Sequence, residues 1–160
     1  MAEVGGIFAG PANPPASMPK AAHEAIEVGL DGLSGDRNLY RYRKKAGDLD
    51  MAVLLLTREE LNTLAAKGWS FNPGDIGENL LLEGVALADI AQPERIIEVG
   101  ESLVLQISRI CDPCKTMVEC PGVSKANIRQ LMRDSLGLRG WYARVITPGT
   151  VKRGDEVRLR

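Results

Sequence analysis

The sequence predicts a mainly β fold, barrel-like or sandwich-like, that also contains two or more short α-helices. Seventeen glycines and nine prolines are spread almost evenly over the 160 residues and separate short runs of β-forming residues. Two segments carry the signals that begin and end a helix. Because no internal repeat and no change of composition marks a boundary, residues 1–160 are expected to form a single domain.

The expected strands are apolar or alternating runs that end at glycine, proline or charged residues. They span residues 3–8, 25–28, 52–56, 79–82, 95–99, 103–110, 141–146 and 156–159. Pro148 and Gly149 occupy the two central positions that a type II turn requires, so a turn is expected there between two strands. Gly154 and Asp155 predict a second turn before the last strand.

Both predicted helices are bounded by capping residues. Thr57 and Glu60 form a capping box at the start of the first, and Gly68 follows its end. The second is predicted to begin at an N-cap at Ser124, to continue with apolar residues at helical spacing, and to end at Gly137.

Composition and charge exclude several functional classes. The chain is 44% apolar and 26% charged, as in globular proteins, and its net charge of −1 provides no overall attraction to nucleic acid or to an anionic membrane. Residues 1–8 have neither a basic start nor a long apolar run, so no signal peptide or membrane span is expected. Three cysteines, an odd number, favour reduced thiols in a soluble cytoplasmic protein.

The cysteine cluster is the main candidate for chemistry. Cys111 and Cys114 follow the predicted strand 103–110, at a position where loops often display functional groups, and Cys120 follows shortly after. Arg109 and Lys115 flank the pair, and nearby cations favour a thiolate over a thiol, whose reference pKa is about 8.5. The cluster therefore suggests a nucleophile or a soft-metal ligand. A structural zinc site, a thioredoxin-type redox pair and inert buried thiols are the alternatives.

Two further segments suggest ligand contacts. The basic segment 37–45 contains Arg37 and two tyrosines, and it either binds a phosphate or stacks on a flat ring, or is a solvated loop. In the segment 73–80, Glu78 and Asn79 enter an apolar strand, where they either cap backbone groups or contact a heterocyclic ligand. The glycines at 29, 32 and 35 do not match the dinucleotide fingerprint, so NAD is not implied.

Together these segments resemble the MOSC domain family, which is named for the C-terminal domain of molybdenum cofactor sulfurases. The resemblance covers roughly residues 25–160. Gly-Asp-Arg at 35–37 is similar to the family's early motif, and Pro-Gly-Asp-Ile-Gly-Glu-Asn-Leu at 73–80 is similar to its most recognisable signature. Pro113-Cys114 resembles the family's functional cysteine, and the segments 143–145, 148–149 and 154–155 resemble its closing strands.

The resemblance implies a β-barrel fold with added helices, a molybdenum-pterin cofactor (molybdopterin), and a cysteine that either carries sulfur or ligates molybdenum. On this hypothesis the catalytic thiol is Cys114, with Cys111 as a second candidate, and Cys114 is also the candidate metal ligand. The candidate cofactor-binding residues are Arg37, Glu78, Asn79, Arg109 and Arg144.

Two mechanisms agree with this hypothesis, a sulfur carrier and a molybdenum-dependent reductase of small substrates. A carrier needs a desulfurase as its sulfur donor. A reductase needs an electron-donor protein, because the chain has no visible flavin, haem or iron–sulfur motif. The alternative from another class is a thiol oxidoreductase or metal-binding module that uses Cys111 and Cys114 as a pair without a pterin cofactor. A binding domain with inert cysteines is the third interpretation.

Overall fold

The computed structural model describes residues 1–36, 41 and 46–160, and most of its regular structure is β-strand. An eight-stranded sheet has the order β11-β7-β8-β9-β5-β6-β1-β2, and a three-stranded sheet has the order β10-β3-β4. The strands are β1 (Glu3–Pro11), β2 (Lys20–His23), β3 (Ala25–Gly29), β4 (Gly32–Leu33), β5 (Val53–Thr57), β6 (Leu80–Glu83), β7 (Ile96–Val99), β8 (Leu103–Ile110), β9 (Trp141–Thr147), β10 (Gly149–Lys152) and β11 (Val157–Leu159).

The large sheet is mixed and is not closed into a barrel. Its neighbouring strands are antiparallel except β5 and β6, which run parallel and are joined through helix α2 (Arg58–Ala66). An isolated bridge links Glu3 of β1 to Glu156, just before β11, and Val4 N donates to Asp155 O at 2.9 Å. The predicted mainly β class is confirmed, whereas β1 meets the segment before β11 through this isolated bridge and a few backbone hydrogen bonds and not through a continuous ladder.

The side chains of strand β5 pack into apolar clusters on both faces of the sheet. All five of its residues are buried. Val53 and Leu55 contribute to the main core between the sheets, whereas Leu54 and Leu56 face the opposite side of the strand. Because successive side chains of a strand point to opposite faces, a continuous apolar run is the pattern expected for a strand covered on both sides.

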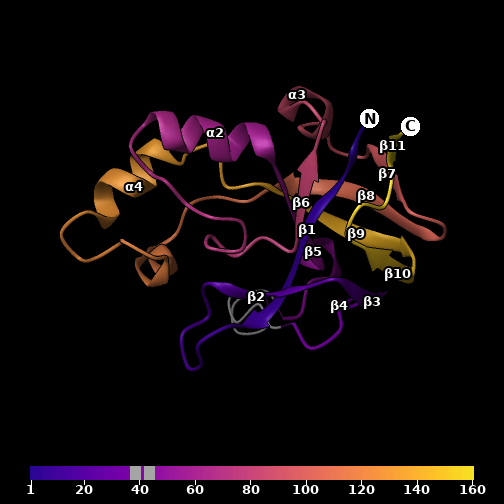
Figure 1. Cartoon of the computed structure of the whole chain (residues 1–160), viewed down its shortest axis with the longest axis horizontal. Coiled ribbons are helices and arrows are strands. Elements are labelled where there is room, and N and C mark those ends of the chain that lie inside the picture. Colours follow the sequence, from indigo (N-terminus) through magenta and orange to yellow (C-terminus); the bar gives the residue numbers. More distant parts are fainter. Residues whose placement is uncertain (37–40, 42–45) are drawn as a thin grey trace.

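Helices α2 and α4 (Ile128–Asp134) lie together at one end of the molecule, beyond the strands (Figure 1). The capping box of Thr57 and Glu60 is present. The second helix begins later than predicted, because Ser124 accepts hydrogen bonds from Ala126 N and Ile128 N in a turn that precedes α4. Leu64 of α2 and Leu131 of α4 are buried in a shared apolar cluster.

Shorter helical segments complete the described part of the chain. They are α3 (Leu87–Ile90) and the 3₁₀ helices η1 (Leu49–Met51) and η2 (Lys115–Glu119). No helix in residues 1–36 or 46–160 has both the length and the apolar character needed to cross a membrane. The two termini lie side by side (Figure 1), and Val157 N donates to Ala2 O at 2.9 Å.

The predicted type II turn at Pro148 and Gly149 is wrong. A type II turn needs a positive φ at its third residue, and Gly149 is not among the glycines with positive φ. Gly149 instead begins β10, which pairs with β3 in the smaller sheet. A Cβ at this position would lie 2.3 Å from Ser102 Oγ, so glycine is needed here for close approach.

Candidate functional site

The three cysteines follow β8 and differ in exposure. Cys111 extends β8, since its N–H donates to Gly140 O at 2.9 Å, and only 3% of the residue is exposed. Cys120 is equally buried, whereas Cys114 is half-buried at the start of η2. All three are free thiols. Cys114 is therefore the thiol that a reagent or partner reaches most easily.

The cation that contacts this cluster is Arg139, which the sequence analysis did not identify. Arg139 Nε and Nη2 both donate to Ile76 O, at 3.0 and 2.7 Å. Its Nη1 lies 3.7 Å from Cys111 Sγ, and its Nη2 lies 3.7 Å from Met18 Sδ. Only 7% of the residue is exposed. A guanidinium group is thus fixed in the interior with one edge facing sulfur.

The backbone beside Arg139 explains its position. Gly140 has a φ of +91°, and a Cβ there would lie 2.4 Å from Leu55 O. Only glycine permits this approach of the chain to β5. Glu60 Oε1 accepts a hydrogen bond from Gly140 N at 3.0 Å, so the acid of the capping box also holds the turn that carries Arg139. The Arg-Gly pair before β9 was the only sequence signal for this residue.

Burial is the largest influence on the pKa values of two of the thiols. Burial raises the pKa of Cys111, although Arg139 and a hydrogen bond with Tyr142 partly oppose this effect. The Cys111 Sγ to Tyr142 Oη distance is 3.4 Å. Burial also raises the pKa of Cys120, to about 12, again opposed by Arg139. Cys111 and Cys120 are accordingly thiols at neutral pH.

Arg109 and Arg144 lie on the face of the sheet that also carries Tyr142. Arg109 pairs with Tyr142 across β8 and β9, and Arg144 is two residues further along β9. Each forms an ion pair with an acid at η1, Arg109 with Asp48 at 2.8 Å and Arg144 with Asp50 at 2.9 Å. Both arginine side chains are more than a third exposed.

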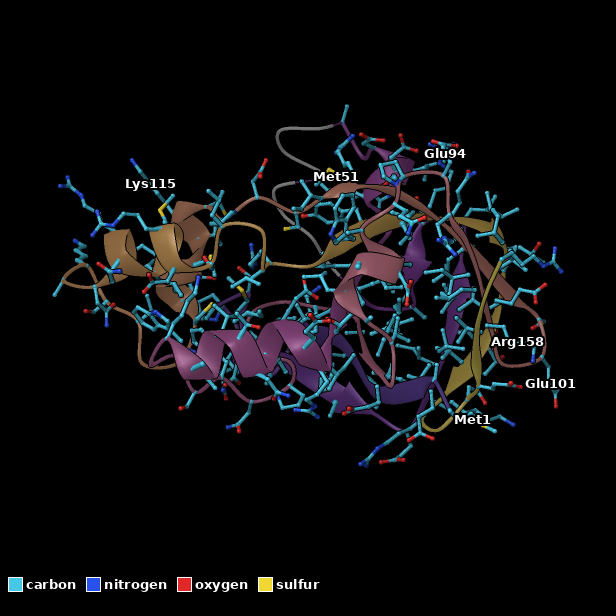
Figure 2. The ribbon with its side chains drawn as sticks, turned by 90° about the horizontal axis from the view of Figure 1, so that it is seen from above. Met1, Met51, Glu94, Glu101, Lys115 and Arg158 are labelled. Carbon is cyan, nitrogen blue, oxygen red and sulfur yellow. The ribbon has the colours of Figure 1, made fainter. Side chains whose placement is uncertain are left out.

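The two cations that flank the cysteines in sequence lie apart from each other. In Figure 2, Met51 of η1 lies over the sheet, whereas Lys115 lies at the α4 end of the molecule with its side chain directed outward. The hydrogen bond from Arg109 lowers the pKa of Asp48. Arg109 is therefore engaged by an acid and Lys115 faces solvent, so Arg139 supplies the cation within contact of a thiol.

Asn79 and Glu78 are both buried in the start of β6. Asn79 Nδ2 donates to Phe8 O at 3.0 Å and to Asp36 Oδ2 at 2.8 Å, and Asn79 Oδ1 accepts from Leu54 N at 2.9 Å. The Asn79 amide is thus occupied by protein groups. Glu78 Oε1 accepts from Gly74 N, whereas Glu78 Oε2 has no hydrogen-bond partner among the described residues. Burial raises the pKa of Glu78.

Asp36 is the last described residue before the basic segment. Although burial opposes its ionisation, the ion pair with Lys20 and hydrogen bonds from Gly10 N and Asn79 lower its pKa. Arg37 lies outside the described residues. Within the segment 37–45, Arg41 is described and is buried, and its guanidinium donates to the carbonyl oxygens of Asp31, Gly47 and Asp48.

Comparison with known proteins identifies the family. A family model described as the MOSC domain matches residues 42–158, which is most of the chain. The chain belongs to the MOSC domain family. No curated protein is similar enough to match it. The resemblance stated from the sequence motifs is confirmed.

Solved structures show the same fold. The YuaD protein of Bacillus subtilis superposes with a TM-score of 0.79 at 19% identity, over 99% of this chain and 94% of that one. YiiM of Geobacillus stearothermophilus gives 0.71 at 20% identity, over 100% and 75% of the two chains. YiiM of Escherichia coli gives 0.69 at 23% identity, over 100% and 70%.

The predicted site residues of this MOSC domain fall into two groups. Cys111, Arg109 and Arg144 are brought together around Tyr142 at the β8–β9 face. Glu78 and Asn79 lie in the interior at β6, and Asn79 contacts Asp36. A surface cavity of about 450 Å³ is lined by residues around Trp69, and another of about 390 Å³ is lined by residues of the segment 27–36. Cys114 lines neither of these two cavities.

The structure bears on the zinc alternative. Within residues 1–36, 41 and 46–160, no group of three or more His, Cys, Asp or Glu side chains is arranged to hold a metal ion. Cys111 is also in contact with the guanidinium group of Arg139, whose positive charge repels a metal cation.

Proposed function

We propose that this MOSC domain carries transferable sulfur on Cys114 and acts together with a molybdenum-pterin cofactor. The observation that carries the proposal is the contrast among the three thiols. Cys111 and Cys120 are buried and have raised pKa values, whereas Cys114 is only half-buried and is the thiol that a partner reaches most easily. The family is associated in general with molybdenum cofactor binding or sulfur transfer.

The sulfur step needs only the Cys114 thiolate and a persulfide donor. The thiolate attacks the outer sulfur of the donor persulfide, a bond forms between Cys114 Sγ and that sulfur, and the donor's S–S bond breaks. The donor leaves as a thiolate and takes up a proton. A cysteine desulfurase is the class of partner that supplies such a persulfide.

The residues of the β8–β9 face fit the charged end of the cofactor. Arg144 Nε is buried and lies at ion-pair distance from Asp50, yet it has no hydrogen-bond partner among the described residues. Arg109 lies on the same face, and two partly exposed guanidinium groups suit a phosphate. We therefore assign Arg109 and Arg144 to the pterin phosphate. When bound, the cofactor supplies a molybdenum centre that accepts sulfur.

The buried state of Cys111 argues against a dithiol redox pair. Such a pair needs an exposed thiol of lowered pKa at the start of an α-helix. Here burial raises the pKa of Cys111, and the residues after Cys114 form a 3₁₀ helix. The sulfur-carrier function is therefore better supported than a thiol oxidoreductase.

The test is sulfur loading followed by site-resolved mass spectrometry. The reduced protein is incubated with a cysteine desulfurase and cysteine and then alkylated. Cleavage after Arg109, Lys115 and Lys125 gives one peptide with Cys111 and Cys114 and a second with Cys120. We expect one added sulfur atom on Cys114, retained in Cys120→Ser and lost in Cys114→Ser. Equal loading of Cys114→Ser and wild type would refute the assignment.

Cofactor binding is tested separately. The protein is purified from a host that makes the cofactor, and its molybdenum content and the fluorescence of oxidised pterin are measured. We expect both in wild type and a loss of pterin in the double variant Arg109→Gln/Arg144→Gln. Absence of molybdenum and of pterin from wild type would contradict the cofactor part of the proposal, while leaving the sulfur-loading result unaffected.

A further inference from the structure

The end of the molecule that contains α4 carries cations that no described acid neutralises. Residues 115–136 contain four cations and two acids, although the whole chain has a net charge of −1. The cations are Lys115, Lys125, Arg129 and Arg133, and the acids are Glu119 and Asp134. All four cations are exposed, and none forms an ion pair with a described residue. This end is therefore locally positive on a chain that is slightly negative.

The stability of α4 does not explain its cations. Arg129 lies in the first turn of the helix, where the helix dipole disfavours a positive charge. Arg133 follows four residues later, a spacing at which two like charges repel each other. The carboxylate of Glu119 is engaged by Ser17, whose N–H and hydroxyl donate to it at 3.0 and 2.6 Å. The excess positive charge is thus available to a partner of opposite charge.

An aromatic cavity adjoins these cations. It has a volume of about 450 Å³ and lies between the loop that follows α2 and residues 121–134. Trp69 and Phe71, which both line it, are stacked with their ring centroids 6.1 Å apart. Gln130 also lines the cavity and accepts a hydrogen bond from Arg133 Nη2 at 2.8 Å. A cation is therefore fixed at the rim of the cavity.

Asp134 determines which groups the cavity accepts. Trp69 Nε1 and Gln130 Nε2 donate to its carboxylate at 2.9 and 2.8 Å, and these hydrogen bonds lower its pKa. The carboxylate is ionised at neutral pH and repels a phosphate or another anion. Aromatic walls and a volume typical of ligand pockets suit an apolar side chain instead. The cavity thus fits an apolar anchor, while the cations beside it fit carboxylates.

The cavity lies close enough to Cys114 for one partner to contact both. Pro121 and Gly122 line the cavity, and η2 connects them to Cys114. Five residues of 3₁₀ helix span about 10 Å and two extended residues about 7 Å, so Cys114 and Pro121 are less than about 20 Å apart. A standard protein interface covers about 800 Å² of each partner, a patch about 30 Å across. One interface of ordinary size therefore spans the thiol and the cavity.

We propose that the cavity, together with Arg129 and Arg133, is the docking surface for the protein that delivers sulfur to Cys114. The occupant is an acidic face of a cysteine desulfurase, with one apolar side chain seated against Trp69 and Phe71. The inference rests on the proposed sulfur-carrier function and adds the surface that recognises the donor. Docking increases the rate of encounter and brings the donor persulfide to Cys114, whereas the persulfide exchange itself is unchanged.

A comparison of two sulfur donors separates docking from chemistry. The desulfurase is expected to contact the docking surface, whereas free cysteine persulfide reacts at Cys114 without contacting the cavity. The initial rate of sulfur loading is measured with each donor at limiting concentration, from the alkylated peptide of residues 110–115. Each measurement is made in about 50 mM and about 500 mM NaCl, because salt screens attraction between exposed charges.

Two variants alter the docking surface, and a third is their matched control. Arg129→Glu/Arg133→Glu reverses the charge beside the cavity, and Ser70→Trp fills the cavity from an exposed position. The control is Lys152→Glu/Arg153→Glu, which reverses two exposed cations at the β10 end, away from α4 (Figure 1). Circular dichroism verifies that each variant is folded.

We expect loading from the desulfurase to be fastest in low salt. The charge reversal should slow it about tenfold and remove its salt dependence, and Ser70→Trp should slow it about fivefold. Loading from cysteine persulfide should stay within about twofold of wild type in both variants, because the thiol and its surroundings are unchanged. The control should load at the wild-type rate with both donors.

The docking proposal is overturned by an unchanged rate from the desulfurase in either docking variant, or by an equal loss in the control. An equal loss with both donors also overturns it, since the substitutions would then act on Cys114 itself. Binding of wild type to a single-stranded oligonucleotide or to phosphatidylserine vesicles, lost on charge reversal while loading is unchanged, would assign the cations to that ligand. Loading of wild type by cysteine persulfide alone contradicts docking, whereas loading by neither donor contradicts the sulfur-carrier function.

Discussion

The carboxyl group of Glu60 makes the stability of this protein depend on pH in a direction opposite to that of most acids. Only 1% of the residue is exposed, and burial raises its pKa from 4.5 to about 7, although hydrogen bonds from Thr57 and Gly140 partly offset the effect. The folded state therefore binds a proton more tightly than the unfolded chain does. The contribution of Glu60 to the free energy of unfolding is therefore fully present below pH 4.5 and is lost as the pH rises through about 7.

The magnitude follows from the two pKa values. A change from 4.5 to about 7 corresponds to about 3 kcal/mol of differential interaction between the protonation states. Replacing Glu60 with glutamine removes this pH dependence. It also places an amide N–H₂ against an N–H donor of Thr57 or Gly140, which costs a further, pH-independent amount of about 1–3 kcal/mol.

Urea denaturation followed by tryptophan fluorescence, at intervals between pH 4.5 and pH 8, measures the effect. We expect wild type to be the more stable protein at pH 4.5. We expect the difference in the free energy of unfolding between wild type and Glu60→Gln to decrease by about 3 kcal/mol by pH 8. A difference that stays constant within about 0.5 kcal/mol over this range would refute the reasoning.

Two further predictions concern contacts that fix the fold around the site. Asn79→Ala removes the partner of Leu54 N and leaves Asp36 with one donor fewer, so it should lower the free energy of unfolding by about 2–3 kcal/mol, whereas Asn72→Ala, at an exposed position, should change it by less than about 0.5 kcal/mol. Gly149→Ala places a Cβ 2.3 Å from Ser102 Oγ and should destabilise by about 1–3 kcal/mol in thermal or chemical unfolding. Its control is Gly29→Ala in the paired strand, where a Cβ meets no atom within 4 Å; an equal effect of both alanines would show that close approach is not the reason for glycine at 149.

The strands that the sequence predicted are those with strong apolar patterns. All eight are present, with ends within a few residues of the prediction. The strands that were missed are β2, β4 and β10. Their signal is weak because β4 has only two residues and because β2 and β10 are mostly half-buried, short, and carry charged or small residues. Such segments become strands through pairing with β1 and β3, which a local pattern does not encode.

The first helix was predicted well because its capping residues interact locally. Thr57 and Glu60 are three residues apart, and both hydrogen bonds of the capping box lie within one turn. The same Glu60 also binds Gly140, which is 80 residues away in the sequence. The capping role was therefore readable from the sequence, whereas the raised pKa and the link to the site depend on long-range contacts and burial.

The sequence by itself determined the mainly β class, the helix start at Thr57, the family resemblance and the placement of three reduced thiols after a strand. These features rest on local periodicity, capping and motif spacing. Only the tertiary structure decided that Cys111 and Cys120 are sealed while Cys114 is reachable, and that Asn79 is occupied by protein groups. It also placed Arg139 against the thiols. The carbonyl that orients Arg139 belongs to Ile76, 63 residues earlier, and burial of a charge is a property of the packed chain that no local pattern specifies.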